Sequence, residues 1–333
     1  MTQHVTSSAT FLMNNDFFNS ALSIFWSDIN LQDDFPARRP LLAHYTSMST
    51  LESILCGKQL WLSNPLYMND LEELRFGMNV GSHRLLGDNR IRQECPSDES
   101  YAYLIDAFHR YYSEFNEAGA LDTYVACFSE HDVAEDDDGS LSMWRGYGAG
   151  GSGAAIVLNT AAVQHSTPSP LMLSPVAYLT SDERMSWIDK SLQSVAALVR
   201  VAKNDTGMLE AIAYAWFQRL KMFALFTKHR GFREEREWRL VYLKDRDPSG
   251  VLSKMISYAV THRGVEPKLK LQLEELANVL GVPVNLGLLV DRILLGPTAS
   301  HALAIASAKR MLTLLNLPHL AEKVRASSIP FRN

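Results

Sequence analysis

The chain has 333 residues, of which 47% are hydrophobic and 21% are charged, a composition typical of a globular protein with one large domain or two small ones. Its formal charge of −5 does not indicate overall electrostatic attraction to nucleic acid, so only a local basic patch would support such binding. Three widely spaced cysteines, the lack of a signal-peptide layout and the lack of a long apolar run predict a cytoplasmic protein with no membrane partner.

Periodicity and turn signals predict the helices and strands in chain order. An amphipathic helix over 9–30 and a proline-containing linker over 33–40 come first. Asp70 is expected to cap a helix, with Glu73 three residues later as a capping box requires. Further helices are predicted over 47–57, 99–119, 181–202, 208–227, 266–280 and 298–316. Strands are predicted over 41–46, 59–64, 123–129, 151–159, 171–179, 237–243, 253–260 and 290–296.

These helices and strands do not alternate regularly, which argues against a doubly wound parallel sheet. The predicted fold class is α+β, with mixed, mainly antiparallel small sheets and surrounding helices. The predicted domain organisation is an N-terminal helical extension and linker over 1–40, followed by a single α+β domain over 41–333.

The segment 231–242 (GFREEREWRLVY) concentrates charge at the start of a predicted strand. Because successive strand residues point to opposite faces, Glu235, Glu237 and Arg239 are expected to share one face, opposite the apolar side chains. Two carboxylates at this spacing repel weakly, and a flanking arginine holds them ionised. The pattern fits either a solvated, salt-bridged strand entrance or a Glu-x-Glu pair with a chemical role.

Two further places carry side chains with open interpretations. His44 and Thr46 lie in the apolar strand over 41–46, where the histidine is either a satisfied core residue or, with the hydroxyl, a hydrogen-bonding pair for a sugar. Trp144 and Tyr147 lie three residues apart and share a side on a helical turn, as a core pair or as an aromatic plate for a flat ring.

Two loops resemble known motifs only superficially. The glycine-rich run 146–153 lacks the glycine order of a dinucleotide-binding motif and the Gly-Lys-Ser/Thr of a P-loop, so it is interpreted as a flexible turn. The acidic run 135–139 lacks the ligand spacing of a calcium loop and is interpreted as a solvated loop.

The order of the short motifs resembles that of a large bacterial family of uncharacterised domains, over about residues 41–332. The motifs are HYTSMSTLESIL (44–55), LWLSNPLYMNDLEE (60–73), CFSE (127–130), WRGY (144–147), GFREEREWRLVY (231–242), ILLGP (293–297) and SSIPFR (327–332). That family in turn resembles, more distantly, the mono-ADP-ribosyltransferases. The His-x-Thr and Leu-x-x-Ile-Leu start is similar to the opening of DNA-modifying ADP-ribosyltransferase toxins and RNA 2'-phosphotransferases.

This second resemblance implies an ADP-ribosyltransferase-like fold that takes NAD as its substrate, with no metal. It implies that His44 and Thr46 hold a ribose and the nicotinamide amide of NAD. Tyr147, or Trp144, is then expected to stack on the nicotinamide ring. The second motif of the transferases is not a clean Ser-Thr-Ser here, and only Ser129 stands for it.

The resemblance also implies the residues that act on the bond. Glu237 matches the acidic residue at the head of a late strand, and Glu235 completes a Glu-x-Glu pair. Cleavage of the nicotinamide–ribose bond develops positive charge on the sugar, and a carboxylate on the adjacent hydroxyl stabilises that charge. Arg233, with Lys228 or Arg230 nearby in the sequence, is expected to neutralise the diphosphate.

The expected activity is transfer of ADP-ribose from NAD to a macromolecule, either protein or nucleic acid, or to water. By analogy at the level of the fold, such an enzyme would be a bacterial toxin or an effector of anti-phage defence. One alternative is a non-catalytic module that senses a nucleotide or docks a partner. Another is a metal-dependent nuclease that uses Asp70, Glu235 and Glu237, although the lysine that usually follows its paired carboxylates is absent.

Overall fold

The computed structural model describes residues 15–29, 38–68, 71–134, 137–163, 169–261 and 264–331. By their contacts the described residues form two compact units, each assembled from three stretches of chain. The helical unit takes residues up to Asn30, then Asn69–Ala120 and Ala177–Arg230, and the sheet unit takes Leu31–Met68, Leu121–Val176 and Gly231–Asn333. This interleaved division differs from the predicted extension over 1–40 and single domain over 41–333.

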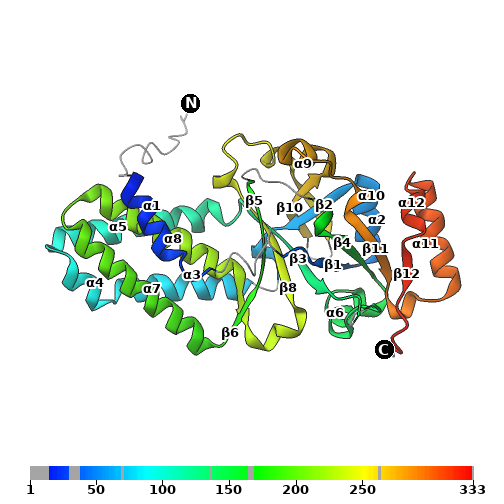
Figure 1. The fold of residues 1–333 in the computed structure, drawn as a ribbon, viewed down its shortest axis with the longest axis horizontal. Coiled ribbons are helices and arrows are strands. Elements are labelled where there is room, and N and C mark those ends of the chain that lie inside the picture. The colour runs from blue at the N-terminus through cyan, green and yellow to red at the C-terminus, as the bar shows by residue number, and fades with distance from the viewer. Residues whose placement is uncertain are drawn as a thin grey trace. The chain divides into compact units, whose positions relative to one another are not determined.

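The helical unit is organised around one buried helix. Helix α8 contacts α1, α3, α5 and α7, and Figure 1 shows these helices gathered along it. The helices are α1 (Asn15–Phe25), α3 (Leu71–Leu86), α4 (Asn89–Glu94), α5 (Asp98–Glu114), α7 (Ser181–Ala202) and α8 (Thr206–Phe226). Two short parallel strands complete the unit, β6 (Ala177–Leu179) and β7 (Thr227–His229). Because α8 is apolar nearly all round, it is buried on every side, as its sequence requires.

The sheet unit contains a ten-stranded sheet in which the described strand pairs are antiparallel, except for the parallel pair β11–β12. Its main path runs β12-β11-β4-β1-β3-β2-β10-β9, and β8 pairs with both β3 and β5. The strands are β1 (Leu41–Thr46), β2 (Gln59–Ser63), β3 (Thr123–His131), β4 (Ala154–Asn159), β5 (Leu171–Pro175), β8 (Glu237–Leu243), β9 (Ile256–Thr261), β10 (Gly264–Gln272), β11 (Val290–Leu295) and β12 (Val324–Ala326). The predicted mixed and mainly antiparallel α+β architecture is therefore confirmed, but most strands join one large sheet.

The described residues of the sheet unit include six α-helices. They are α2 (Met48–Gly57), α6 (Leu141–Gly146), α9 (Leu273–Leu280), α10 (Leu286–Leu289) and α11 (Ala302–Leu314), followed by the short α12 (Pro318–Ala321). Apolar side chains of α2, α9, α10 and α11 pack with Leu42, Phe128 and Trp238 of the sheet, and we call this side the large-core face. Trp144 of α6 packs with Ala43 and other residues on the opposite side, which we call the α6 face. The alternation along each strand thus builds a core on both faces.

Several predicted elements changed in type or extent. Residues 266–272 lie in β10 rather than in a helix, because their leucines alternate with polar residues and pair with β2 before the helical spacing of α9 begins. The predicted strand 171–179 divides at Val176 into β5 and β6, which belong to different sheets. Of the predicted leading helix, Asn15–Phe25 is described as α1, while its first residues, Asp70 and residues 135–136 lie outside the described residues.

Two further predictions concern the cysteines and a possible membrane span. The three cysteines are free thiols in the structure. Within the described ranges, no helix combines the length and the apolar character needed to cross a bilayer.

Candidate functional site

The charged segment before β8 is shaped by one backbone reversal. The 3₁₀ helix η6 (Arg230–Glu235) ends at Arg236, whose φ of 41° lies in the left-handed region, and β8 begins only at Glu237. The backbone N–H of Glu130 on β3 donates to the Arg236 carbonyl at 2.8 Å, which fixes this reversal against the sheet. Glu237 and Arg239 share a face as predicted, but Glu235 precedes the strand and does not follow its alternation.

Glu237 is held in a buried ion pair. Arg239 Nε donates to Glu237 Oε1 at 2.7 Å and Arg239 Nη2 donates to Oε2 at 3.3 Å. The side chains are 4% and 5% exposed for Glu237 and Arg239 respectively. Their register with Ser129, which pairs with both Glu237 and Ala43, places them on the α6 face of the sheet. The guanidinium therefore neutralises Glu237 inside the protein and leaves it little contact with solvent.

Glu235 is the more accessible carboxylate. Tyr147, which follows α6 as its C-cap residue, donates its hydroxyl to Glu235 Oε1 at 3.0 Å. Ser129 Oγ donates to the Glu235 backbone carbonyl at 2.7 Å and anchors the segment to β3. Tyr147 is 41% exposed and Phe232 is 47% exposed. Because residues three apart in a 3₁₀ helix are eclipsed, Phe232 lies on the same side of η6 as Glu235.

We call Phe232, Glu235 and Tyr147 the Glu235 site. It offers a carboxylate that accepts a hydrogen bond from a phenol, and the rings of Tyr147 and Phe232 are both exposed. Carboxylates bind sugar hydroxyls and aromatic faces stack on flat rings, so the arrangement suits a nucleoside. Phe232 was not predicted, and its signal in the sequence was its place three residues before Glu235. Arg233 is also exposed on η6, whereas Lys228 and Arg230 belong to the helical unit.

His44 and Thr46 lie on the other face of the sheet. His44 pairs with Ile156 and Thr46 with Ala154, and Ile156 and Ala154 belong to the large core. His44 Nδ1 donates to the Cys127 carbonyl at 3.0 Å. The sheet therefore separates this pair from Glu237, and the predicted convergence of His44 with the glutamates is not observed. The core interpretation of His44 is the one that fits this structure.

The position of His44 makes stability depend on pH. Burial lowers its pKa, the Cys127 carbonyl opposes this, and the charge of Lys268 lowers the pKa further. Below the ordinary histidine pKa of about 6.5, the unfolded chain therefore binds more protons than the native one, and stability falls as the pH falls. We expect His44→Gln to weaken this loss between about pH 7 and pH 5, measured by hydrogen exchange of β1 amides. The same slope in His44→Gln and in the exposed control His319→Gln would contradict the assignment.

Trp144 is part of the core, as the core interpretation predicted. It has no exposed surface, packs edge-on against Tyr45 with ring centroids 4.8 Å apart, and donates Nε1–H to the Asp138 carbonyl at 3.0 Å. It is therefore not available to stack on a ligand. Of the predicted aromatic pair, only Tyr147 reaches the surface.

The glycine-rich run is a turn that is closely packed at Gly153. Gly153 N–H donates to the Gly148 carbonyl at 2.9 Å, and Gly296 N–H donates to the Gly153 carbonyl at 2.9 Å. A Cβ at Gly153 would lie 2.1 Å from the Thr46 carbonyl oxygen. Glycine is required here because three backbone segments meet with no space for a side chain.

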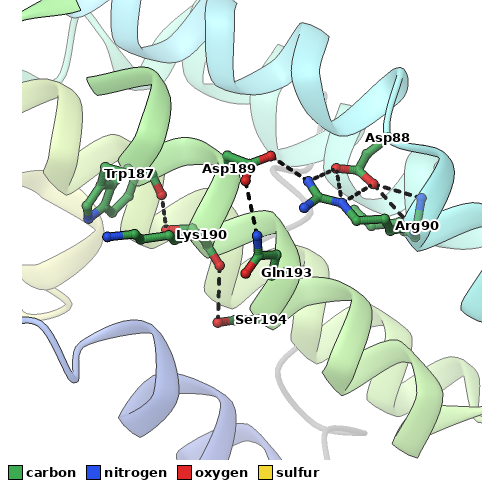
Figure 2. A network of polar contacts seen from close by, with 9 residues as sticks. Asp88, Arg90, Trp187, Asp189, Lys190, Gln193 and Ser194 are labelled. Carbon is green, nitrogen blue, oxygen red and sulfur yellow. Dashed lines mark hydrogen bonds and ion pairs between the residues drawn. The ribbon is translucent and has the colours of Figure 1, made fainter. Parts of the chain in front are cut away.

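A polar hollow of about 690 Å³ lies in the helical unit between α4 and α7. Figure 2 shows Arg90 reaching from α4 between two carboxylates. Arg90 Nη2 donates to Asp88 at 2.5 Å and to Asp189 at 2.8 Å, and Gln193 donates to the other oxygen of Asp189 at 3.1 Å. The hydrogen bond from Arg90 lowers the pKa of Asp88, which also caps α4. Arg90 is thus shared by the two carboxylates, and the network links α4 to α7.

Among the residues that the structure describes, no group of three His, Cys, Asp or Glu side chains is placed to hold a metal ion. Glu237 is bonded to a guanidinium, and Asp70 lies outside the described residues.

Comparison with known proteins gives one match, over part of the chain. Residues 143–240 match the model of a family described as "Protein of unknown function (DUF2971)". Searches of the curated proteins and of the solved structures gave no match. The matched span includes Tyr147, Phe232, Glu235, Glu237 and Arg239. The resemblance to an uncharacterised family is thus confirmed over this span, and the more distant likeness to mono-ADP-ribosyltransferases stays a prediction.

Proposed function

We propose that the protein binds NAD at the Glu235 site and cleaves its nicotinamide–ribose bond, passing ADP-ribose to a protein, a nucleic acid or water. The observation that carries the proposal is the hydrogen bond of 3.0 Å from the exposed Tyr147 to Glu235 Oε1, and the exposed Phe232 lies on the same 3₁₀ helix as Glu235. A solvent-accessible carboxylate, already oriented, is the group this bond cleavage needs.

The acting carboxylate in this proposal is Glu235 rather than Glu237. As the bond to nicotinamide breaks, positive charge develops on the ribose, and a hydrogen bond from a ribose hydroxyl to Glu235 strengthens. Glu237 is already neutralised by Arg239, so it contributes much less to stabilising that charge. Its role is to position the strand entrance. His44 has no role here, because it lies on the large-core face.

The neighbouring groups supply the remaining contacts. Nicotinamide stacks on Tyr147 or Phe232, whose rings are exposed. Arg233 is exposed on the same 3₁₀ helix and meets the diphosphate. Ser129 holds the Glu235 carbonyl at 2.7 Å and so fixes the carboxylate relative to the sheet.

A second candidate is a nucleotide-binding module without turnover. The buried Glu237–Arg239 pair favours it, because that pair removes one of the two carboxylates expected to act. Binding without chemistry would use the same rings and the same Glu235. The two candidates therefore differ in turnover and not in the location of the ligand.

The test is nicotinamide release from NAD by the purified protein, with and without cell lysate as a source of acceptors. We expect Glu235→Gln to lower kcat by roughly 10²–10⁴-fold, within the range for a positioned acid or base. Tyr147→Phe is expected to lower kcat about tenfold, through loss of one hydrogen bond to a charged group. Glu234→Gln, an exposed neighbour on η6, is the matched control and is expected to keep full activity.

Three outcomes are distinguishable. If the unchanged protein releases nicotinamide and the Glu235→Gln variant does not, the result supports the enzyme. Stabilisation by NAD that Glu235→Gln weakens, with no release in any condition, supports the binding module. Equal behaviour of Glu235→Gln and Glu234→Gln in both assays would exclude the Glu235 site from either function.

A further inference from the structure

The sheet unit holds an apolar cavity of about 360 Å³ on its large-core face. Leu42, Phe128 and Leu240 line it from β1, β3 and β8, and Leu276 and Leu280 line it from α9. Strand β5, labelled with α9 in Figure 1, also contributes lining residues. A well-packed core has few voids larger than one water, whose share of liquid volume is about 30 Å³. This space is far larger than such a void and is partly open to solvent, so it is a pocket of the sheet unit.

The walls of the cavity are mainly aliphatic, and its polar groups lie apart from one another in sequence. The Thr160 hydroxyl donates to the Pro40 carbonyl at 2.7 Å, and Ser169 Oγ accepts from the Leu171 N–H at 3.1 Å. Both hydroxyls are thus already engaged with the backbone. When an apolar ligand replaces water against apolar walls, binding is favoured in proportion to the apolar area that is covered. The body of a matching ligand is therefore a hydrocarbon chain.

Arg246 supplies the only cationic side chain among the described lining residues. It is exposed, and within the part of the chain that the structure describes no carboxylate forms an ion pair with it. The next residue, Asp247, is turned inward, where it accepts from the Tyr242 hydroxyl at 3.0 Å and from the backbone N–H groups of Leu252 and Ser253. Arg246 is thus available for an anion at the cavity.

We propose that this cavity binds an amphiphile with a medium-length, unbranched hydrocarbon chain and an anionic head that pairs with Arg246. The volume of about 360 Å³ lies within the range of known ligand pockets, which is about 300–1,000 Å³. Carboxylate and phosphate heads share the chemistry that a guanidinium recognises. The proposal is independent of the nucleotide proposal, since Glu235 contacts Ser129 and Tyr147, whereas the cavity is lined by Leu42 and Phe128 of the large-core face.

The test is calorimetric titration of delipidated full-length protein with decanoate, decyl phosphate and decanol. We expect one molecule of each anionic ligand to bind per chain, and decanol to bind about tenfold more weakly, because it lacks the charge that meets Arg246. Arg246→Gln is expected to weaken both anions by about tenfold and to leave decanol unchanged. Lys254→Gln, an exposed residue outside the cavity lining, is the charge control and is expected to change nothing.

A second pair of variants tests the cavity itself. Leu276→Phe places a larger side chain in the space and is expected to weaken all three ligands, while Leu314→Phe, 74% exposed on α11, is the control. Circular dichroism establishes that each variant is folded, and Arg246 is exposed, so its substitution keeps the test valid if Leu276→Phe fails to fold. Failure of both anions to bind, or binding that Arg246→Gln leaves unchanged, would overturn the proposal. Decanoate and decyl phosphate together show which head is preferred.

Discussion

Replacement of Arg239 by methionine is expected to destabilise the sheet unit by about 3–5 kcal/mol, because it removes the guanidinium that pairs with the buried carboxylate of Glu237. Glu237 is 4% exposed in its side chain and takes two hydrogen bonds from Arg239. Solvent cannot reach the carboxylate to replace those bonds unless the strand moves. Chemical denaturation measures the loss, and hydrogen exchange of the β3 amides locates it in the sheet.

The double variant Glu237→Gln with Arg239→Met isolates the charge effect. Removing both charges together is expected to recover most of the lost stability, since no unpaired ion then remains buried. Arg310→Met, at an exposed position on α11, serves as the control for loss of an arginine and is expected to change stability by no more than about 0.5 kcal/mol. A double variant as unstable as Arg239→Met alone would show that the pair stabilises the fold by some means other than charge.

Gly153→Ala is expected to cost about 3 kcal/mol, at the upper end of the range for overpacking. The added methyl group would lie 2.1 Å from the Thr46 carbonyl oxygen and 2.9 Å from the Gly148 carbonyl oxygen. Both are backbone atoms, so no side chain can rotate to make room. The end of β1 or the turn at Gly148 must move, and thermal unfolding measures the consequence.

Gly146→Ala is the matched control within the same glycine-rich run. Nothing lies within 4 Å of a Cβ at Gly146, which is the last residue of α6. Alanine is favoured over glycine in a helix by roughly 0.5–1 kcal/mol, so this change is expected to be neutral or stabilising. If Gly146→Ala and Gly153→Ala destabilise equally, then the run is sensitive to any side chain and the close contact at Gly153 is not the cause.

The sequence predicts strands well where apolar and polar residues alternate clearly. Strands β1, β3, β8 and β11 lie close to their predicted positions. Strand β10 was missed because its leucines continue into α9, and the change from a period of two to a helical period occurs within one run at Leu273. The two interleaved units were missed because their contacts join segments about a hundred residues apart, which local patterns do not reveal.

The candidate site shows a more specific limit. The alternation along β1 and β8 predicts which residues of each strand share a face. It does not predict which face of β1 lies on the same side of the sheet as a given face of β8. The pairing of β3 with both strands decides this, and it places His44 and Glu237 on opposite sides. Glu235 was misplaced for another reason: the left-handed conformation of Arg236 ends the alternation, and arginine gives no sign of it in the sequence.

Strand β3 therefore serves two compartments with neighbouring side chains. Phe128 lines the apolar cavity, and the next residue, Ser129, binds the backbone carbonyl of Glu235 on the opposite face. Deletion or insertion of one residue earlier in β3 would shift the register by one residue. The Phe128 ring would then face the α6 side, and the Ser129 hydroxyl would face the large core. A single such change would therefore disrupt both sites at once.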